Sequence, residues 1–455
     1  MTVWLVRSGW GNDKGNTYHY DTDREPVSTV CASGCIAGGG DYYLIDDGKP
    51  AAALSTRKPP YKVPSMLEVA DVRGTNGYKV ASTFSGCGGS CLGFEMAGYD
   101  VRFASEFIPS AQDTYRANHP GVHLDTRDIR EVEPEQILEI AGVAKGELDV
   151  FEGSPPCASF SMAGSRDDGW GKIKTYSGRK QRTDDLFWEY ARLVDGIKPK
   201  VFVAENVSGL VRGVAKGYFR DILEMFKGLG YHVEARLVDA QWLGVPQARQ
   251  RIIFMGVRDD LGVYPVFPKP WPYRYSIRDA CPWIVRAGTA PPLDEWRASG
   301  RSIDATMKDA STIPSSTITT TTNEGTGWCE AEDGPGDLTD SVESLRGTCV
   351  GEEWQNVPVG GASDKYYQIK KSDPENPSFT ITAAGGTKCA GPVHPFERRK
   401  FTIHELKRLC AFPDDFNLLG SYAQQWERLG RSVPPLMMRA IASTIRDEVL
   451  PKCSR

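Results

Sequence analysis

An apolar, strand-like run that ends in two consecutive prolines constrains the fold of this chain more than any other feature. The run, Leu148-Asp149-Val150-Phe151, leads into Gly153-Ser154-Pro155-Pro156-Cys157. Two prolines fix φ and remove two backbone donors, so the chain cannot continue in a sheet. It must turn out at the carboxyl end of the strand, where open α/β sheets bind ligands. Cys157 is thereby placed on a stiff loop, where its thiolate would be a strong nucleophile. Taken alone, the segment favours a buried, inert cysteine, which is the usual state of a free cysteine.

Length and composition indicate a globular protein of two or three domains. The chain has 455 residues, of which 40% are hydrophobic and 25% charged. No run of about 18 apolar residues predicts a membrane span, and the N-terminus does not resemble a secretory signal. Eleven scattered cysteines without a Cys-x-x-Cys pair indicate a reducing cytosol and predict no metal site. The net charge is −5, so any nucleic-acid contact would need a local basic patch.

A second segment predicts a nucleotide-type site. Residues 79–84 form an expected strand, a glycine-rich turn follows, and a helix is expected from Cys91. Only glycine lets backbone approach a ligand closely at such a turn. The next expected strand, residues 101–105, ends in Glu106, which is placed to accept hydrogen bonds from ribose hydroxyls. The candidate loop residues are Phe84, Ser85, Gly86, Cys87, Gly88 and Gly89.

Two later stretches add candidate contacts. Asp128 could accept from an exocyclic amine, with Ile129 against a flat ring. Residues 166–183 are rich in glycine and basic residues and could contact phosphates and close over a substrate. A solvated charged loop would explain the charge of this segment but not its place after Cys157. Its cations are Arg166, Lys172, Lys174, Arg179, Lys180 and Arg182.

The βαβ rhythm continues to residue 258. A helix is expected over residues 184–197, and a buried strand over 200–204 runs into Glu205-Asn206-Val207. A carboxylate there would lie near Cys157 if the two strands are neighbours. A helix at 218–229 and strands at 231–237 and 252–257 follow. Arg249 and Arg251 share one face before the last strand, an arrangement that is more often a structural ion pair than a catalytic group.

The rest of the chain has a different character. Residues 259–400 are rich in Pro, Gly, Ser and Thr, with β-type runs such as 317–321 and 379–382, and predict a small, mostly β or irregular domain. Helices are expected again at 402–412 and 436–449. A Pro-x-x-Thr pattern occurs near residues 26, 314 and 377. It suggests that the β-rich N-terminal extension, residues 1–77, packs with residues 259–400, although chance similarity of turn-rich sequence is an alternative.

With these pieces assembled, the chain resembles the cytosine-C5 DNA methyltransferases that depend on S-adenosylmethionine. The likeness covers about residues 78–258 and 400–449, with the motifs in the family's order. The matching motifs are Phe84–Gly89, Glu106, Asp128-Ile129, Pro155-Pro156-Cys157, Glu205-Asn206-Val207, Gln247-x-Arg249-x-Arg251, Phe401-Thr402-Ile403 through Phe412-Pro413-Asp414-Asp415-Phe416, and Ser432-Val433-Pro434-Pro435. The chain departs from the pattern at Ala158, where the family usually has Gln, and at Arg431, where it usually has Asn.

The resemblance implies a Rossmann-like class I methyltransferase domain over residues 78–258, a target-recognition domain over 259–400, and a return to the first domain over 401–455. It implies that Cys157 attacks C6 of a flipped-out cytosine and that Glu205 protonates or hydrogen-bonds N3 of the base. Arg249 would orient the base or its phosphate and help to lower the pKa of the thiol, and Arg251 is a further expected catalytic residue. Pro156, Ser432 and Val433 would join the loop in binding S-adenosylmethionine. The expected partner is double-stranded DNA, contacted by the basic loop, and a cognate restriction endonuclease is a further candidate. The protein would be a cytoplasmic monomer from a bacterium or a phage-infected cell.

Three alternatives stay open at this point. An RNA-directed relative would methylate tRNA, but such relatives have a small recognition region. A non-catalytic DNA-binding relative would keep the fold, although Cys157, Glu205 and Arg249 are intact. A dehydrogenase would use the glycine loop for a dinucleotide and leave the prolines, Cys157 and Glu205 without a role.

Overall fold

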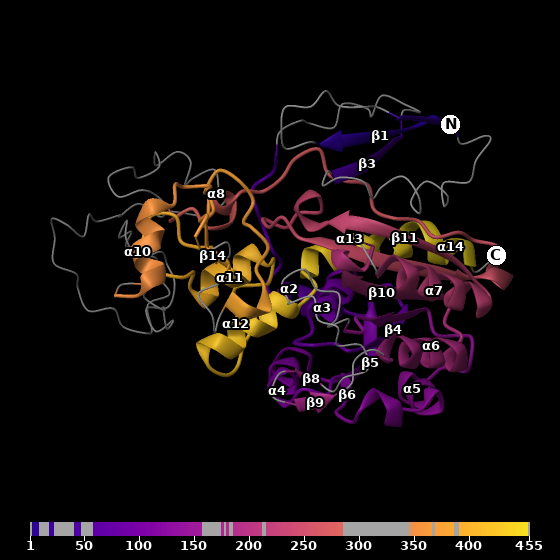
Figure 1. The fold of residues 1–455 in the computed structure, drawn as a ribbon. Helices are drawn as coiled ribbons and strands as arrows, with labels where there is room; N and C mark the ends of the chain where they lie inside the picture. Colours follow the sequence, from indigo (N-terminus) through magenta and orange to yellow (C-terminus); the bar gives the residue numbers. More distant parts are fainter. Residues whose placement is uncertain are drawn as a thin grey trace.

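A seven-stranded sheet with helices on both faces forms the centre of the protein in the computed structural model (Figure 1). The structure describes residues 58–156, 185–211, 215–284, 345, 347–365, 369–385 and 391–453, and, for the backbone alone, five further strands. Those strands are β1 (Thr2–Ser8), β2 (Tyr18–Asp21), β3 (Asp41–Asp46), β8 (Lys174–Tyr176) and β9 (Arg179–Gln181).

The strand order of the central sheet is β11-β12-β10-β7-β4-β5-β6. Neighbouring strands are parallel except that β12 runs antiparallel to β10 and β11. The chain order reverses between β4 and β7, so the sheet has a topological switch point there. The bounds are β4 (Lys79–Thr83), β5 (Asp100–Ser105), β6 (His123–Asp125), β7 (Val150–Gly153), β10 (Val201–Val207), β11 (Tyr231–Asp239) and β12 (Gln250–Arg258).

Both faces of this sheet are buried. Along β10, Val201 and Val203 belong to one hydrophobic cluster, whereas Phe202 and Ala204 belong to the cluster on the opposite face. Alternate side chains of a strand point to opposite faces, so a strand covered on both sides reads as a continuous apolar run. That property made β10, which begins Val201-Phe202-Val203-Ala204, recognisable in the sequence, and the predicted α/β fold class is confirmed.

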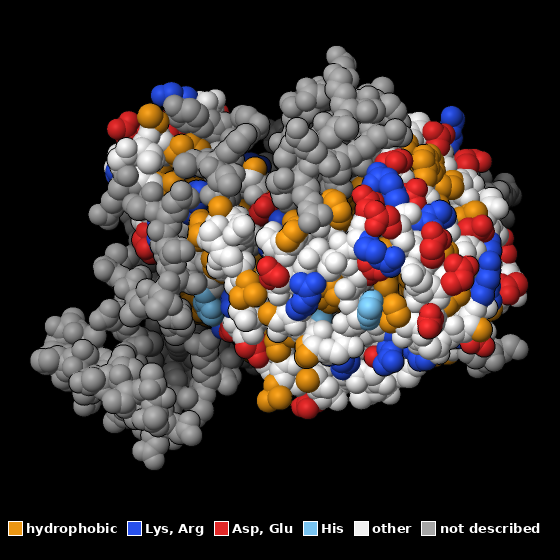
Figure 2. All heavy atoms as spheres, turned by 90° about the horizontal axis from the view of Figure 1, so that it is seen from below, with side chains coloured by type: hydrophobic (Ala, Val, Ile, Leu, Met, Phe, Trp, Pro, Cys, Tyr) orange, Lys and Arg blue, Asp and Glu red, His pale blue; other side chains and the backbone are white. Residues whose placement is uncertain are grey.

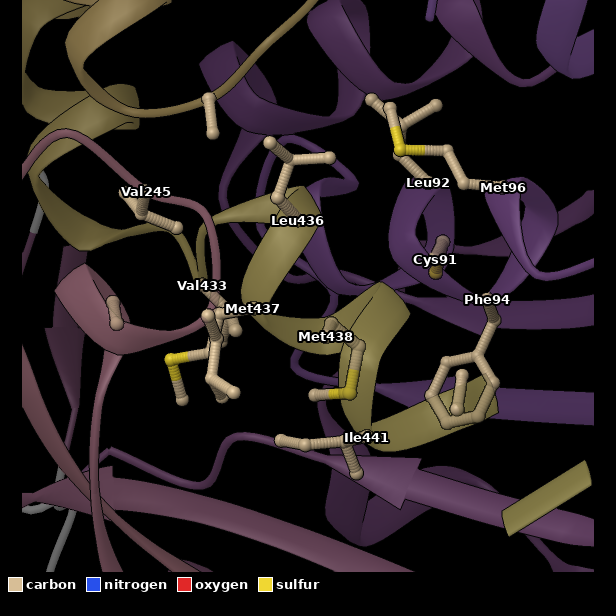
Figure 3. Close-up of a cluster of buried hydrophobic side chains, with 14 of the residues drawn as sticks. Cys91, Leu92, Phe94, Met96, Val245, Val433, Leu436, Met437, Met438 and Ile441 are labelled. Carbon is tan, nitrogen blue, oxygen red and sulfur yellow. The ribbon is translucent and has the colours of Figure 1, made fainter. Parts of the chain in front are cut away.

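One face is covered by α3 (Gly89–Met96) and α13 (Pro435–Thr444), which pack closely against each other. Figure 3 shows side chains of both helices, among them Leu92, Met438 and Ile441, within one buried cluster. The approach is close because Gly93 faces α13: a Cβ built at Gly93 would lie 2.6 Å from Cβ of Met438 and 2.7 Å from the carbonyl oxygen of Pro435. Glycine at this position therefore sets the distance between the two helices.

Three helices cover the other face of the sheet. The predicted helices at 184–197 and 218–229 are present as α6 (Leu186–Ile197) and α7 (Ala215–Gly228). The third helix is α5 (Pro134–Ala141), which the sequence analysis did not predict.

The helix expected at 436–449 is α13, followed by a π-helical turn at Ile445–Val449 and by α14 (Leu450–Cys453). The remaining helices are α2 (Met66–Val72) and α4 (Pro109–Asn118).

A second group of elements lies to the left of the sheet in Figure 1. It contains two short parallel strands and several helices, and Leu345, Val357, Ile369 and Val393 form a small hydrophobic cluster within it. Its elements are α8 (Ile277–Ala280), α10 (Cys349–Asn356), β13 (Ile369–Lys371), β14 (Gly391–Val393), α11 (Ile403–Leu409) and α12 (Tyr422–Arg431).

The strand predicted at residues 379–382 is wrong. Residues 379–382 form no strand, and the residue before them, Ser378, makes an isolated bridge with Gln247. The backbone groups of Ile381 pair with side chains instead: its N–H donates to Oε1 of Gln247 at 3.2 Å, and its carbonyl accepts from Arg249 at 3.0 Å. Residues 317–321, the other predicted β run, and the Pro-x-x-Thr segments near residues 26 and 314 lie outside the described residues.

At the N-terminus, β1, β2 and β3 form an antiparallel sheet in the order β2-β1-β3. The predicted association of residues 1–77 with residues 259–400 stays a prediction. On the face shown in Figure 2, Lys and Arg side chains of the described residues are interspersed with Asp and Glu side chains, so charges of one sign do not gather there. In the part of the chain that the structure describes, no helix is long and apolar enough to cross a bilayer.

We expect Gly93→Ala to destabilise the protein, because the new methyl group would meet backbone atoms of α13 and force the two helices apart. Overpacking of this kind costs about 1–3 kcal/mol. Gly217→Ala is the matched control, since that glycine lies in α7 with no atom within 4 Å of a built Cβ. Thermal unfolding followed by circular dichroism measures both variants. Equal unfolding temperatures would contradict the close-packing role of Gly93.

Candidate active site

A cavity of about 410 Å³ opens at the carboxyl ends of β4, β5, β7 and β10, next to the switch point of the sheet. This volume is in the range of small-molecule sites, about 300–1,000 Å³. Most of the residues that the sequence analysis selected line it together. They are Phe84, Ser85, Gly86, Cys87, Gly89, Glu106, Asp128, Ile129, Pro156, Glu205, Arg249, Arg251, Ser432 and Val433.

The glycines of the loop after β4 serve different purposes. Gly86 has a φ of 58°, and a Cβ built on it meets nothing within 4 Å, so this backbone faces the open cavity. Gly88, with a φ of 93°, does not line the cavity and abuts Nε2 of His119, 2.1 Å from a built Cβ. A Cβ on Gly89 would lie 2.4 Å from the carbonyl oxygen of Val433. Gly88 and Gly89 therefore allow close packing, while Gly86 leaves room for a ligand.

Two acidic residues fix this loop and the wall beside it. Glu106 is buried after β5, and its two carboxyl oxygens accept the backbone N–H groups of Gly86 and Ile108, each at 2.7 Å. Burial raises the pKa of Glu106. Asp128 accepts from the backbone N–H and from the guanidinium of Arg130 at 3.0–3.1 Å. Both carboxylates are thus held in place by protein donors at the edge of the cavity.

The loop that carries the predicted nucleophile enters the same cavity. Ser154, Pro155 and Pro156 line it, and the carbonyl oxygen of Pro155 accepts from Nδ2 of Asn206 at 2.9 Å. Gly153 is required before them, because a Cβ there would lie 2.5 Å from the ring of Tyr190. Asn206 therefore ties the end of β10 to the loop that leaves β7.

Several predicted site residues lie outside the described residues or in strands that are described by their backbone alone. Cys157, Arg166, Lys172 and Arg182 lie outside the described residues, as does Ala158. Lys174 lies in β8, and Arg179 and Lys180 lie in β9, an antiparallel pair described by its backbone alone. The predicted roles of these residues stay predictions.

Glu205 and Arg251 form an ion pair within the cavity. Nε of Arg251 lies 2.6 Å from Oε1 of Glu205, and the two side chains are only 13% and 10% exposed. The sheet positions them, because β10 and β12 are antiparallel neighbours with Val207 opposite Arg251. A charge-assisted contact at this distance is strong and directional. It orients the carboxylate of Glu205 beside the prolines of the nucleophile loop.

Arg249 has a different set of partners from those that the resemblance implied. It is 1% exposed, and its Nη atoms donate to the carbonyl oxygens of Ile381, Gly430 and Ser432 at 2.9–3.0 Å. Burial, and then the nearby charge of Arg251, lower its pKa to about 9. The guanidinium thus joins β12 to two distant segments that form the far wall of the cavity, which favours a positioning role.

Several cavity residues were missed in the sequence, among them Arg127, Thr380 and Arg428. Arg428 is buried, and its charge lowers the pKa of Glu106 against the effect of burial. Arg428 and Arg431 are three residues apart on α12, so they share one face of that helix. That spacing, directly before Ser432-Val433, was the available signal. Arg431 lines the cavity and donates from Nε to Glu427 at 2.8 Å.

Known proteins resemble this chain over most of its length. A family model described as C-5 cytosine-specific DNA methylase matches residues 78–447. The type II methyltransferase M1.HphI of Haemophilus parahaemolyticus is 32% identical over 364 residues, covering 80% of this chain and 85% of that protein. The type II methyltransferase M.NgoPII of Neisseria gonorrhoeae is 29% identical over 376 residues, covering 82% and 96%.

Two solved structures share the fold. One is described as a DNA modification methyltransferase encoded within an E. coli prophage, with a TM-score of 0.56 and 23% identity over 81% of this chain and 98% of that one. The other is DNMT2 of Spodoptera frugiperda, with a TM-score of 0.51 and 16% identity over 83% and 100%. The family model covers far more than half of the sequence, and the fold agrees with it. The chain therefore belongs to the family of C-5 cytosine-specific DNA methylases.

Proposed function

We propose that this DNA cytosine-5-methyltransferase transfers a methyl group from S-adenosylmethionine to a flipped-out cytosine in specific sites of double-stranded DNA, through a covalent bond between Cys157 and C6. The observation that supports it most is the shared cavity: the Glu205–Arg251 pair, Pro155-Pro156, the glycine loop and Glu106 all line it. A base and a cofactor could therefore meet in one enclosed space.

The lining residues fit S-adenosylmethionine. The backbone at Gly86 faces open space, and α3 begins directly after the loop, which favours acceptor groups of a ligand. Glu106 would accept from ribose hydroxyls, and Asp128 with Ile129 would contact the adenine. Pro156, Ser432 and Val433 would complete the wall. When bound, this cofactor supplies an electrophilic methyl group to the reaction.

The residues of the chain would divide the remaining chemistry. The thiolate of Cys157 adds to C6, which places electron density at C5 of the ring. Glu205 then holds a proton at N3 while negative charge builds on the base. Arg251 contacts Oε1 of Glu205, so we assign the N3 contact to Oε2. After methylation C5 loses its proton to a base and Cys157 is eliminated. The cytosine must be flipped out first, which costs a few kcal/mol.

Recognition of DNA would fall to residues 166–183 and 259–400. The basic loop follows Cys157 in sequence and would close over the phosphates, and residues 259–400 would read base edges in the major groove. The named relatives are type II methyltransferases, which supports a role in modification at specific sites, with a restriction endonuclease as functional partner. We expect a monomer that works in the cytoplasm of a bacterium or a phage-infected cell.

Trapping with 5-fluorocytosine tests the covalent step. Fluorine at C5 cannot leave as a proton, so a methylated adduct cannot eliminate the sulfur and remains bound to the protein. We expect a DNA–protein band on a denaturing gel for the native protein and for Cys349→Ser, an exposed cysteine, but none for Cys157→Ser. A band with Cys157→Ser would show that another nucleophile acts.

Glu205→Gln is expected to lower the rate of methyl transfer by about 10²–10⁴-fold, the usual contribution of a positioned acid–base group. The control is Glu234→Gln, because Glu234 also pairs with an arginine, Arg236, at 3.0 Å but lies in the edge strand β11. Single-turnover rates with labelled cofactor measure both variants. A normal rate for Glu205→Gln would remove this residue from the chemistry.

The substrate class is tested by methylating duplex DNA and tRNA side by side with labelled cofactor. We expect methylation of DNA alone, and bisulfite sequencing of DNA from expressing cells then gives the site. Preferential labelling of tRNA would contradict the DNA assignment while leaving the chemistry intact.

A further inference from the structure

A carboxyl group that the proposed chemistry does not use is buried beneath the cavity. Glu152 lies in β7 and is 1% exposed. Its Oε2 accepts from the hydroxyl of Ser82 at 2.6 Å, and its Oε1 lies 3.5 Å from the hydroxyl of Ser154. A charged carboxylate in an apolar core is costly unless it is paired with a cation. The contacts of Glu152 are instead hydroxyl groups.

A chain of hydroxyl groups connects Glu152 to the cavity. The hydroxyl oxygens of Ser82 and Ser85 lie 2.8 Å apart, and both serines are buried. Ser85 lines the cavity, and Ser154 lines it beside the prolines. Hydrogen bonds therefore connect Glu152 through Ser82 to Ser85, and this chain ends at the cavity surface that would meet the cofactor.

The groups around Glu152 disfavour its charge. Glu205 of β10 raises the pKa of Glu152 through its negative charge. The other titratable groups that interact electrostatically with Glu152 are Cys91 of α3, Tyr115 of α4 and, from the opposite face of the sheet, Tyr190 of α6. The hydroxyls of Ser82, Ser90 and Ser154 act in the opposite direction. Burial is the largest effect, and the pKa of Glu152 is raised to about 7. Both protonation forms are thus available near neutral pH.

The protonation of Glu152 decides what Ser85 can offer a ligand, because each serine has one hydrogen to donate. When Glu152 is ionised it only accepts, so Ser82 donates to Glu152, Ser85 donates to Ser82, and Ser85 presents lone pairs to the cavity. When Glu152 is protonated it can donate to Ser82. Ser82 then donates to Ser85, and the hydrogen of Ser85 is directed into the cavity.

The cavity next to Ser85 suits a ligand acceptor. The helix α3 begins at Gly89, and the first N–H groups of a helix have no partner within it. These donors and the positive end of the helix dipole favour a negatively charged group. In S-adenosylmethionine the carboxylate of the methionine moiety has this charge, and bound beside Ser85 it would take a donor from the serine rather than a lone pair.

We propose that the Glu152–Ser82–Ser85 chain is a proton switch of the cofactor loop, such that S-adenosylmethionine binds best when Glu152 carries a proton. The inference rests on the proposed function, because it takes this ligand for the cavity. Glu152 acts through the serines and is a positioning residue. Binding keeps the proton on Glu152, so the protein takes up protons on binding, and affinity is highest below about pH 7 and falls as the pH rises through and beyond that value.

Calorimetric titration of the intact protein with S-adenosylmethionine tests the switch without measuring catalysis. Titrations at pH 7.5 in phosphate and in Tris, buffers of different ionisation enthalpy, give the number of protons taken up. We expect a net uptake for the native protein relative to Glu152→Gln, together with an affinity that falls by up to about tenfold per pH unit above pH 7. Subtracting the proton uptake measured for Glu152→Gln from that of the native protein removes the contribution of the amino group of the ligand.

Three variants define the expected pattern. Glu152→Gln can donate from its amide at every pH, so we expect the affinity of the native protein at low pH and no pH dependence from this position. Ser82→Ala interrupts the chain with a small change in volume and should also remove the proton uptake. Glu448→Gln, at an exposed glutamate of the π-helical turn, should leave both quantities at their native values.

The outcomes separate this inference from the proposed function. Proton uptake that is lost in both Glu152→Gln and Ser82→Ala supports the switch. Normal binding with equal uptake in the native protein and both variants overturns the switch and leaves the methyltransferase assignment standing. Failure of the native protein to bind S-adenosylmethionine would overturn both.

Discussion

The buried guanidinium of Arg249 is the interaction on which the cavity depends. Its partners are three backbone carbonyl groups on two segments, that of Ile381 on one and those of Gly430 and Ser432 on the other. Each hydrogen bond to a charged group contributes about 1.5–3 kcal/mol, which offsets the cost of burying the cation. Its pKa of about 9 still leaves it charged at neutral pH. A lysine could not replace it, because one ammonium cannot reach three carbonyls in the directions that a planar guanidinium does.

The hydrogen bonds of Arg249 explain why the site is built from segments that are far apart in the sequence. One wall of the cavity comes from the strand ends of the sheet, and the other comes from residues 380–384 and 428–433. These segments pack backbone to backbone, since a Cβ on Gly430 would lie 2.5 Å from the backbone nitrogen of Ala383. The second wall therefore exists only when the chain has returned to the sheet. Cofactor binding, base binding and the fold share the same long-range contacts.

The sequence predicted the parts of this structure that depend on local pattern. Short strand-like runs located β4, β7 and β10, and glycines and prolines located the loops after β4 and β7, because these residues restrict or release the backbone themselves. The strand expected at 379–382 failed for the opposite reason: its polar backbone groups pair with Gln247 and Arg249, more than 130 residues away in sequence. No local pattern records such contacts.

Glu152 and Glu205 show how one sheet can hold two acids in opposite environments. Glu152 of β7 lies opposite Val203 of β10 in the sheet. Val203 is two residues before Glu205, and residues two apart in a strand share a face, so both carboxyl groups are on the same face of the sheet. Arg251 pairs with Glu205, whereas Glu152 has hydroxyl partners and a raised pKa. Environments that separate two acids in this way assign them different roles. A proton on Glu152 removes a negative charge from beside Glu205. In the roles proposed here, Glu152 holds its proton for the cofactor loop, and Glu205 holds its proton for N3 of the base.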